Sequence, residues 1–234
     1  MVKDHSQKLY EYLLPYVTAN KKEKFEIILS QRTRALTVVL EDIFKPHNAS
    51  AVMRTAECMG LQDVHVVEQD NVFNLNPYVL RGSGKWLSVH HHQQNPKVNN
   101  MQKCMDDLKS KGYQVLATTP HGNAIDYSDV VISKKTAVIF GAEENGISDY
   151  VIKNADQLIK IPMLGFTESF NISVSASIIL ENYNNQIRNK LEWSLSKDEK
   201  WELTIEWMKK AVPNIDIHLR QFEKEQKIFL TNQQ

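Results

Sequence analysis

Two segments in the C-terminal half of the sequence combine glycine or proline with polar residues, and each follows a short apolar run that reads as a buried strand. Glycines just past a strand let a ligand approach the backbone closely, because they carry no side chain and tolerate positive φ. Two such segments at the ends of neighbouring strands would form a cofactor pocket of backbone amides and carbonyls. A third polar segment follows the first predicted strand. The three segments are 45–55, 140–148 and 161–175.

The polar side chains of these segments are candidates for catalysis, although each also has a purely structural interpretation. Arg54 lies among small apolar residues of a predicted helix, where an arginine is costly unless it is paired, used or extended into solvent. Asn48 would be a good N-cap for that helix. Glu143 could be an ordinary helix N-terminal acid, and Asn171 could cap the long helix that follows it. Only the coincidence of the three segments favours a catalytic role.

Two other segments resemble ligand-binding motifs without satisfying them. Residues 81–86 suggest a phosphate loop, but Val79 stands where the pattern requires glycine and Trp86 where it requires Ser or Thr. No GxGxxG opens a helix after the first predicted strand, so a dinucleotide site is unsupported. The histidines 90–92 are consecutive in a strand-like run, where neighbours point to opposite faces. We therefore predict no metal site.

Alternating short strands and helices must position these residues. The strands are apolar throughout, as in a sheet covered on both faces, and their separation by helices predicts an α/β fold with a mostly parallel sheet. The predicted strands are Leu36–Leu40, Val64–Val67, Leu87–His91, Tyr113–Ala117, Thr136–Phe140 and Gln157–Ile161. The predicted helices are Ala49–Met59, Val98–Lys111, Ser148–Asn154 and Ile172–Arg188.

Helical extensions flank this domain at both ends. We predict an N-terminal, partly basic helical segment over 1–34, with Asn20 as a helix cap, the α/β domain over 35–190, and a polar helical segment over 191–234. In the last segment Ser196 and Glu199 form a predicted capping box. Its tryptophans are interpreted as packing anchors rather than platforms for base stacking.

The composition is that of an ordinary globular protein. Lysine plus arginine and aspartate plus glutamate each number 28, so an RNA-binding surface requires local segregation of charge. Cys58 and Cys104 are far apart without metal-ligand spacing and are expected to be reduced thiols, as in a reducing cytosol. No apolar stretch approaches ~18 residues and no signal core is present. The protein is expected to be soluble and cytoplasmic, with no membrane partner.

Taken together, the order and spacing of the three segments closely resemble the signature motifs of the SPOUT superfamily of RNA methyltransferases. The Lys-Pro-His-Asn run at 45–48 and the basic helix before the first strand are similar to the tRNA guanosine-2′-O-methyltransferase branch. The resemblance covers roughly residues 20–190. It implies a deep trefoil knot in the C-terminal part of the domain, although true knots are nearly absent from other proteins. It also implies a homodimer.

The resemblance further implies S-adenosylmethionine as the cofactor and a ribose 2′-hydroxyl of tRNA, at guanosine 18 of the D-loop, as the methyl acceptor. The implied cofactor-binding residues are Thr118, Gly141, Ala142, Ile161, Met163, Ser169 and Phe170. The implied catalytic residues are Arg54, Asn48, Glu143, Ser169 and Asn171. The residues expected to contact RNA are Lys24, Arg32 and Lys85.

Within this resemblance, the implied role of Arg54 follows from chemistry. A guanidinium remains protonated in proteins, so it is a poor general base. We favour an electrostatic role, in which Arg54 stabilises the developing 2′-oxyanion and holds a neighbouring phosphate. An activated general base is the alternative.

The sequence also departs from the branch in ways that keep other functions open. Residues 182–190 carry fewer positive charges than the basic run of the branch, Phe170 replaces a leucine, and the net charge near zero is low for a tRNA binder. Ribose methylation of ribosomal RNA or of another tRNA position is therefore an alternative, as is a non-catalytic knotted RNA-binding module. A nucleotide-dependent oxidoreductase or phosphotransferase lacks its own motifs.

Overall fold

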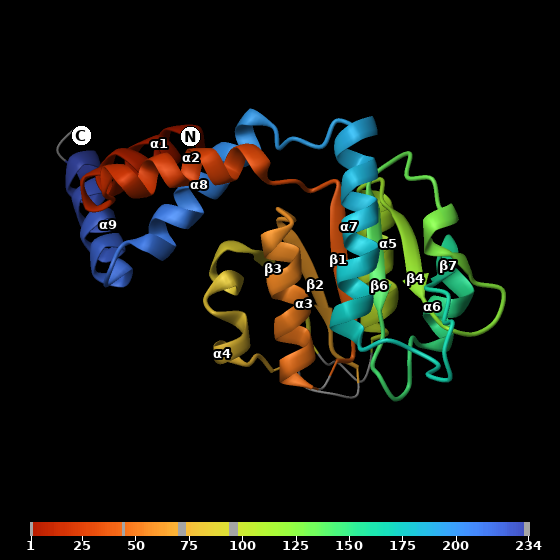
Figure 1. Cartoon of the computed structure of the whole chain (residues 1–234). Coiled ribbons are helices and arrows are strands. Elements are labelled where there is room, and N and C mark those ends of the chain that lie inside the picture. The colour runs from red at the N-terminus through yellow and green to blue at the C-terminus, as the bar shows by residue number, and fades with distance from the viewer. Residues whose placement is uncertain (1, 44, 70–73, 94–97, 232–234) are drawn as a thin grey trace. The chain divides into compact units, whose positions relative to one another are not determined.

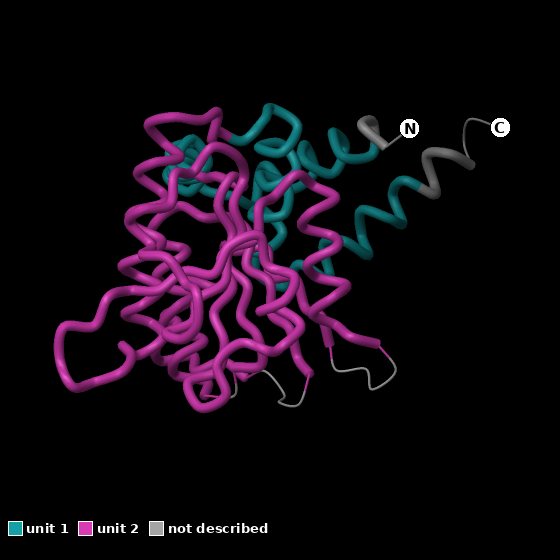
Figure 2. Tube along the Cα trace, turned by 90° about the vertical axis from the view of Figure 1, so that its right-hand side faces the viewer, with its two compact units in different colours: residues 1–31, 195–234 teal, residues 32–194 magenta. Residues whose placement is uncertain are grey.

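The computed structural model describes residues 2–43, 45–69, 74–93 and 98–231. The chain divides into two compact units, one of residues 32–194 and one that combines residues 1–31 with 195–234 (Figure 2). The terminal extensions, which the sequence suggested as two separate segments, are thus parts of a single unit.

The unit of residues 32–194 is built on a seven-stranded sheet (Figure 1). The strand order is β3-β2-β1-β6-β4-β7-β5, and every neighbouring pair is parallel. The strands are β1 (Leu36–Glu41), β2 (Asp63–Val67), β3 (Ser88–His92), β4 (Gln114–Thr118), β5 (Ile125–Asp126), β6 (Thr136–Phe140) and β7 (Gln157–Lys160). Since β6 lies between β1 and β4, and β7 between β4 and β5, later strands are inserted between earlier ones.

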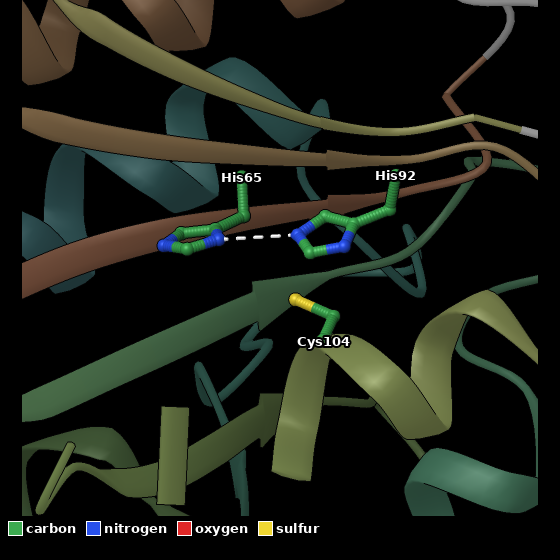
Figure 3. Close-up of side chains that lie close together, drawn as sticks. All are labelled: His65, His92 and Cys104. Atoms are coloured by element: carbon green, nitrogen blue, oxygen red, sulfur yellow. Dashed lines mark hydrogen bonds between the residues drawn. The ribbon is translucent and has the colours of Figure 1, made fainter. Parts of the chain in front are cut away.

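Helices cover both faces of the sheet, which explains why its central strands are apolar throughout. Helices α3 (Pro46–Cys58) and α7 (Ile172–Lys190) pack on one face, over β1, β2 and β6. Helices α5 (Asn100–Ser110) and α6 (Asp149–Asn154) pack on the other. On that second face Cys104 of α5 lies against the histidines of β2 and β3 (Figure 3).

Shorter elements complete this unit. The helix α4 (Pro77–Leu80) packs against α3, and the 3₁₀ turns η2 (Ser83–Trp86) and η3 (Tyr127–Asp129) lie in connecting segments. The 3₁₀ turn η1 (Leu14–Tyr16) belongs to the other unit.

The six predicted strands and four predicted helices of the domain are confirmed, with the strand ends within one residue. The two-residue strand β5 was not predicted, because so short a segment has no detectable periodicity. The prediction that Asn48 caps α3 is wrong: Lys45 is the N-cap and Pro46 begins the helix, since proline is pre-organised for the first helical position. Asn48 therefore lies inside the first turn, with its side chain available for other contacts.

The other unit consists of helices. These are α1 (Val2–Leu13), α2 (Ala19–Gln31), α8 (Lys197–Ala211) and α9 (Ile215–Thr231). The predicted capping box of Ser196 and Glu199 is confirmed, whereas Asn20 is already the second residue of α2 and does not cap it. Trp207 is fully buried, with its ring 5.5 Å from that of Phe25, which confirms its packing role. Among the described residues, no helix is both long and apolar enough to cross a bilayer.

Candidate active site

A cleft of about 400 Å³ opens at the carboxyl ends of β4, β6 and β7. In parallel α/β sheets this edge is the usual place for a ligand. Residues 118–121, 140–147, 159–161, 163 and 168–170 line the cleft, together with residues of α7. All seven residues predicted to bind the cofactor are among its walls: Thr118, Gly141, Ala142, Ile161, Met163, Ser169 and Phe170.

The segment after β6 folds back on itself to form one wall of the cleft. The amide of Gly146 donates to the carbonyl of Ala142 at 2.8 Å, and Gly146 has a φ of +68°. A Cβ atom on Gly141 would lie 2.1 Å from the carbonyl oxygen of Gly146 and 2.5 Å from the amide nitrogen of Ile147. The two glycines are therefore required for different reasons, one for close backbone approach and the other for positive φ.

A buried carboxyl group fixes the far end of this segment. Glu41, the last residue of β1, is 5% exposed. Its two oxygens accept from the amide (3.0 Å) and the hydroxyl (2.6 Å) of Ser148, the N-cap of α6. Burial raises the pKa of Glu41 above its ordinary value, and the bonds from Ser148 oppose this effect.

A hydrogen-bonded network lies next to the cleft and joins the three polar segments of the sequence, which we call the rim network: Lys45, Asn48, Glu143 and Asn171. The amide Nδ2 of Asn171 donates to Glu143 Oε1 at 2.7 Å and to Asn48 Oδ1 at 3.2 Å. Glu143 Oε2 accepts from Lys45 Nζ at 2.7 Å. The side chain of Asn171 also accepts from the amide of Ser173 at 2.9 Å, which caps α7 as predicted.

The charges of the rim network are complementary. The hydrogen bond from Lys45 is the largest cause that lowers the pKa of Glu143, and bonds from Asn48 and Asn171 act in the same direction. The same contact raises the pKa of Lys45. Glu143 is thus an anion at neutral pH and orients the amides around it rather than accepting a proton.

The structure does not bring Arg54 into the rim network. It is exposed on α3, two turns beyond the network, and its guanidinium lies 3.5 Å from the carbonyl of Val79 at α4. Ser169 is exposed and lines the cleft. The predicted catalytic residues therefore form one hydrogen-bonded group of three (Asn48, Glu143, Asn171), one cleft residue and one separate cation.

The three residues predicted to contact RNA have different surroundings. Lys24 is exposed on α2, and Lys85 is exposed with its ammonium 5.3 Å from the ring centre of Trp86. Arg32 is 1% exposed, and its guanidinium pairs with Glu57 at 2.6 Å and donates to the carbonyl of Leu61 at 2.7 Å. The prediction for Arg32 is therefore wrong, because a buried and paired guanidinium cannot reach a phosphate.

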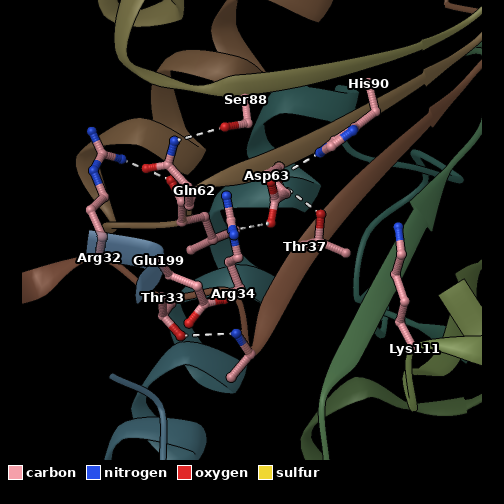
Figure 4. A network of polar contacts seen from close by, with 12 residues as sticks. Arg32, Thr33, Arg34, Thr37, Gln62, Asp63, Ser88, His90, Lys111 and Glu199 are labelled. Atoms are coloured by element: carbon pink, nitrogen blue, oxygen red, sulfur yellow. Dashed lines mark hydrogen bonds and ion pairs between the residues drawn. The ribbon is translucent and has the colours of Figure 1, made fainter. Parts of the chain in front are cut away.

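The neighbouring Arg34 is also used within the fold, where it pairs with Asp63 at 3.2 Å (Figure 4). The cluster of basic residues at the exit of α2, read from the sequence as an RNA-binding feature, thus contributes two of its arginines to internal ion pairs.

Sequence reasoning missed three residues around the site. Lys45 belongs to a segment that had been singled out, but its pairing with Glu143 joins residues far apart in sequence. Lys160 lines the cleft from the end of β7, and Glu41 supports it from the end of β1. Their positions at strand ends were the available signal, since the carboxyl edge of a parallel sheet collects functional side chains.

Comparison with known proteins gives a family match over most of the α/β unit. Residues 35–181 match the SpoU rRNA Methylase family. A tRNA (guanosine(18)-2'-O)-methyltransferase of Borreliella burgdorferi is 39% identical over 203 residues, which cover 86% of this chain and 90% of that protein. The enzyme of the same name from Thermus thermophilus is 37% identical over 163 residues, 70% of this chain and 81% of that one.

Solved structures agree with the sequence comparison. The crystal structure of the A. aeolicus TrmH/SpoU tRNA modifying enzyme has a TM-score of 0.73 at 27% identity and covers 82% of this chain and 97% of that one. The SpoU methyltransferase AviRb of Streptomyces viridochromogenes, solved with its cofactor AdoMet, has a TM-score of 0.58 at 23% identity, covering 68% of this chain and 60% of that one. The latter similarity extends to the fold alone.

Proposed function

Because this chain belongs to the SpoU rRNA Methylase family, we propose that it methylates a ribose 2′-oxygen of tRNA, at guanosine 18, with S-adenosylmethionine as the methyl donor. The similarity to tRNA (guanosine(18)-2'-O)-methyltransferases over most of both chains supports the substrate. The observation that carries the proposal is the position of Asn171, which links Asn48 to Glu143 and so joins the three polar segments beside the cleft.

The cleft fits the proposed cofactor in size and in chemistry. Its volume of about 400 Å³ lies in the range of sites for ligands of this size. Its walls combine apolar side chains with polar and charged ones, and the close approach of Gly141 to Gly146 shapes one of them. S-adenosylmethionine supplies an electrophilic methyl group when bound. The protein has to hold the acceptor oxygen in line with that methyl group, and such positioning accounts for much of the rate.

Within this proposal, the rim network and Arg54 have separate tasks. Asn171 and Glu143 fix the edge of the cleft where the ribose must enter, and Lys45 neutralises the carboxylate of Glu143. Arg54 is exposed and extends from α3 toward α4, so it is accessible to a substrate phosphate. From there it stabilises the negative charge that develops on the 2′-oxygen.

The same family membership supports three further parts of the proposal. The insertion of β6 and β7 between earlier strands is consistent with a trefoil knot formed by the chain after β6. A homodimer would cover Leu164 and Phe166, two large apolar side chains that are fully exposed next to the cleft residues 168–170. A tRNA-modifying enzyme of this kind acts in the cytoplasm.

The test is methyl transfer from labelled S-adenosylmethionine to unmodified tRNA transcripts, with the product mapped by nuclease digestion and mass spectrometry. Wild type is compared with Arg54→Ala and Arg54→Lys. Arg220→Ala removes an exposed arginine of α9 and controls for the general loss of one positive charge. We expect 2′-O-methylguanosine in the D-loop with wild type and with Arg220→Ala, and a loss of at least a hundredfold in rate with Arg54→Ala.

Four other outcomes separate the alternatives. If Arg54→Lys retains activity with a shifted pH–rate profile, Arg54 acts as a base; loss at every pH supports the electrostatic role. Transfer to ribosomal RNA but not to tRNA would overturn the substrate and keep the reaction. Cofactor binding without transfer to either RNA would indicate a non-catalytic RNA-binding module.

A further inference from the structure

Three side chains with metal-binding atoms meet on the face of the sheet that is covered by α5. They are His65 of β2, His92 of β3 and Cys104 of α5 (Figure 3). The Nδ1 atom of His65 lies 3.3 Å from Nε2 of His92, and the ligand atoms of all three residues lie within 4.8 Å of one another. They belong to neither the cleft nor the rim network.

The spacing of these atoms is close to that of a tetrahedral zinc site. With Zn–N bonds of about 2.0–2.1 Å and a Zn–S bond of about 2.3 Å, two nitrogens on one ion lie about 3.3 Å apart and sulfur about 3.6 Å from each. The imidazole pair already has this separation. The thiol has to approach by about 1.2 Å at most, which a rotation of the Cys104 side chain can supply.

Burial sets the protonation state of these side chains before any ion binds. His65 is 4% exposed and Cys104 is fully buried, whereas His92 is half-buried and gives an ion access from solvent. Burial lowers the pKa of His65 to about 3, so its ring is neutral at physiological pH. The Cys104 thiol is protonated, with a pKa raised to about 12 by burial. Binding of a divalent ion would therefore release one proton from the sulfur.

The other two histidines of the triplet have different roles. His90 stacks on His65 with ring centres 4.5 Å apart, and its Nε2 lies 3.0 Å from a carboxylate oxygen of Asp63 (Figure 4). His91 is exposed and alternates with His90 and His92 along β3, so it faces the opposite side of the strand. Only His92 of the triplet is thus left to join His65 and Cys104.

We propose that His65, His92 and Cys104 bind one Zn²⁺ ion, with water in the fourth position. The ion would connect the edge strand β3 and the adjacent β2 to helix α5. Its effect is on stability, because the site is distinct from the proposed catalytic residues. The sequence did not suggest it, since the ligands come from three elements without a common motif; the triplet at 90–92 alone favoured no metal site.

The site can be tested on the full-length protein, purified with reductant, stripped of metal by a chelator and dialysed. Zinc binding is measured by calorimetry with Zn²⁺ alone, and Co²⁺ is used as a spectroscopic probe of cysteine coordination. The test variants are Cys104→Ser and His92→Gln. His92 is half-buried, so its substitution tests the site without a change in the core. Cys58→Ser and His91→Gln are the matched controls, because Cys58 is an exposed thiol and His91 an exposed neighbour.

We expect one Zn²⁺ per chain, a thiolate-to-Co²⁺ charge-transfer band, and a rise in the midpoint of thermal unfolding on addition of Zn²⁺. Both controls should keep these properties. His92→Gln should weaken zinc binding at least tenfold, and Cys104→Ser should abolish the charge-transfer band. The proposal is overturned if wild type binds no zinc, or if His92→Gln and Cys104→Ser bind it as wild type does. The cluster is then a metal-free pair of hydrogen-bonded imidazoles beside a buried thiol.

Discussion

The cleft and the rim network lie beside each other at the carboxyl edge of the sheet, but backbone contacts shape the cleft and side-chain hydrogen bonds hold the rim. The cleft wall at Gly141 and Gly146 is a backbone-to-backbone contact without room for one extra carbon atom. The rim is held by side chains, with Asn171 as the shared donor to Glu143 and Asn48. The comparison indicates that cleft function depends on steric fit, whereas rim function depends on hydrogen-bond partners. Substitutions should therefore fail in different ways in the two regions.

The largest effect is expected from Gly141→Ala, which tests the steric side of the comparison. Its Cβ would lie 2.1 Å from the carbonyl oxygen of Gly146, so the whole segment must move and the cleft wall with it. We expect the affinity for S-adenosylmethionine to fall at least a hundredfold, or about 2.8 kcal/mol. Calorimetric titration with the cofactor measures this directly.

Gly165→Ala is the matched control for this prediction. A Cβ at Gly165 meets nothing within 4 Å, so the same chemical change should leave cofactor affinity within a factor of two. Equal affinities for Gly141→Ala and wild type would show that the cofactor does not depend on this wall, and that the cleft is not its site.

A smaller and more selective effect is expected at Asn171, where two functions of one side chain can be separated. Asn171→Ala removes the cap of α7, which costs about 1 kcal/mol of the free energy of unfolding, and also removes the donor to Glu143. Asn171→Asp keeps an acceptor for the amide of Ser173 but places a second carboxylate against Glu143. We expect both variants to lose methyl transfer, at least tenfold, and only Asn171→Ala to lose the cap.

Denaturant unfolding and single-turnover methyl transfer distinguish these effects. Asn99→Ala serves as the control, because Asn99 caps α5 through the amide of Gln102 at 2.9 Å and lies outside the rim network. It should lose stability without losing activity. If Asn171→Asp transfers methyl groups at the wild-type rate, the donor function of Asn171 is not required.

The fold could be predicted from the sequence because its signals are local. Each buried strand is a short apolar run, and each long helix has its own periodicity, so their limits were found to within a few residues. Two of the failures have local causes as well. Pro46 moved the start of α3 ahead of Asn48, and β5 is too short to show a pattern.

The site could be predicted only in part. The residues expected to bind the cofactor came from the family resemblance, and they line the cleft; all but Thr118 lie in two of the polar segments. The sequence does not show that Lys45 pairs with Glu143, that Arg32 is buried against Glu57, or that His65 meets Cys104. These are contacts between distant residues, and they depend on which strands become neighbours. A basic residue therefore looks the same in sequence whether it binds phosphate or an internal carboxylate.

The smallest effect is expected at Glu41, whose carboxylate accepts hydrogen bonds from Ser148 at the end of the cleft segment 140–147. Glu41→Gln keeps both hydrogen bonds, since the amide oxygen can accept from the Ser148 amide and the amide nitrogen can donate to the Ser148 hydroxyl.

The pKa of Glu41 is raised in the folded protein by burial. The folded state therefore binds this proton more tightly than the unfolded chain, and wild type loses stability as the pH rises through and above the ordinary carboxyl range. The neutral glutamine has no such loss.

We expect the free energy of unfolding of Glu41→Gln to equal that of wild type at low pH and to exceed it at neutral pH, by no more than about 1 kcal/mol. Denaturant unfolding across this pH range measures the difference, with Glu202→Gln, an exposed position on α8, as the control. A glutamine variant that is less stable than wild type at neutral pH would show that the charge of Glu41 itself holds the segment, and the cleft would then share the electrostatic construction of the rim.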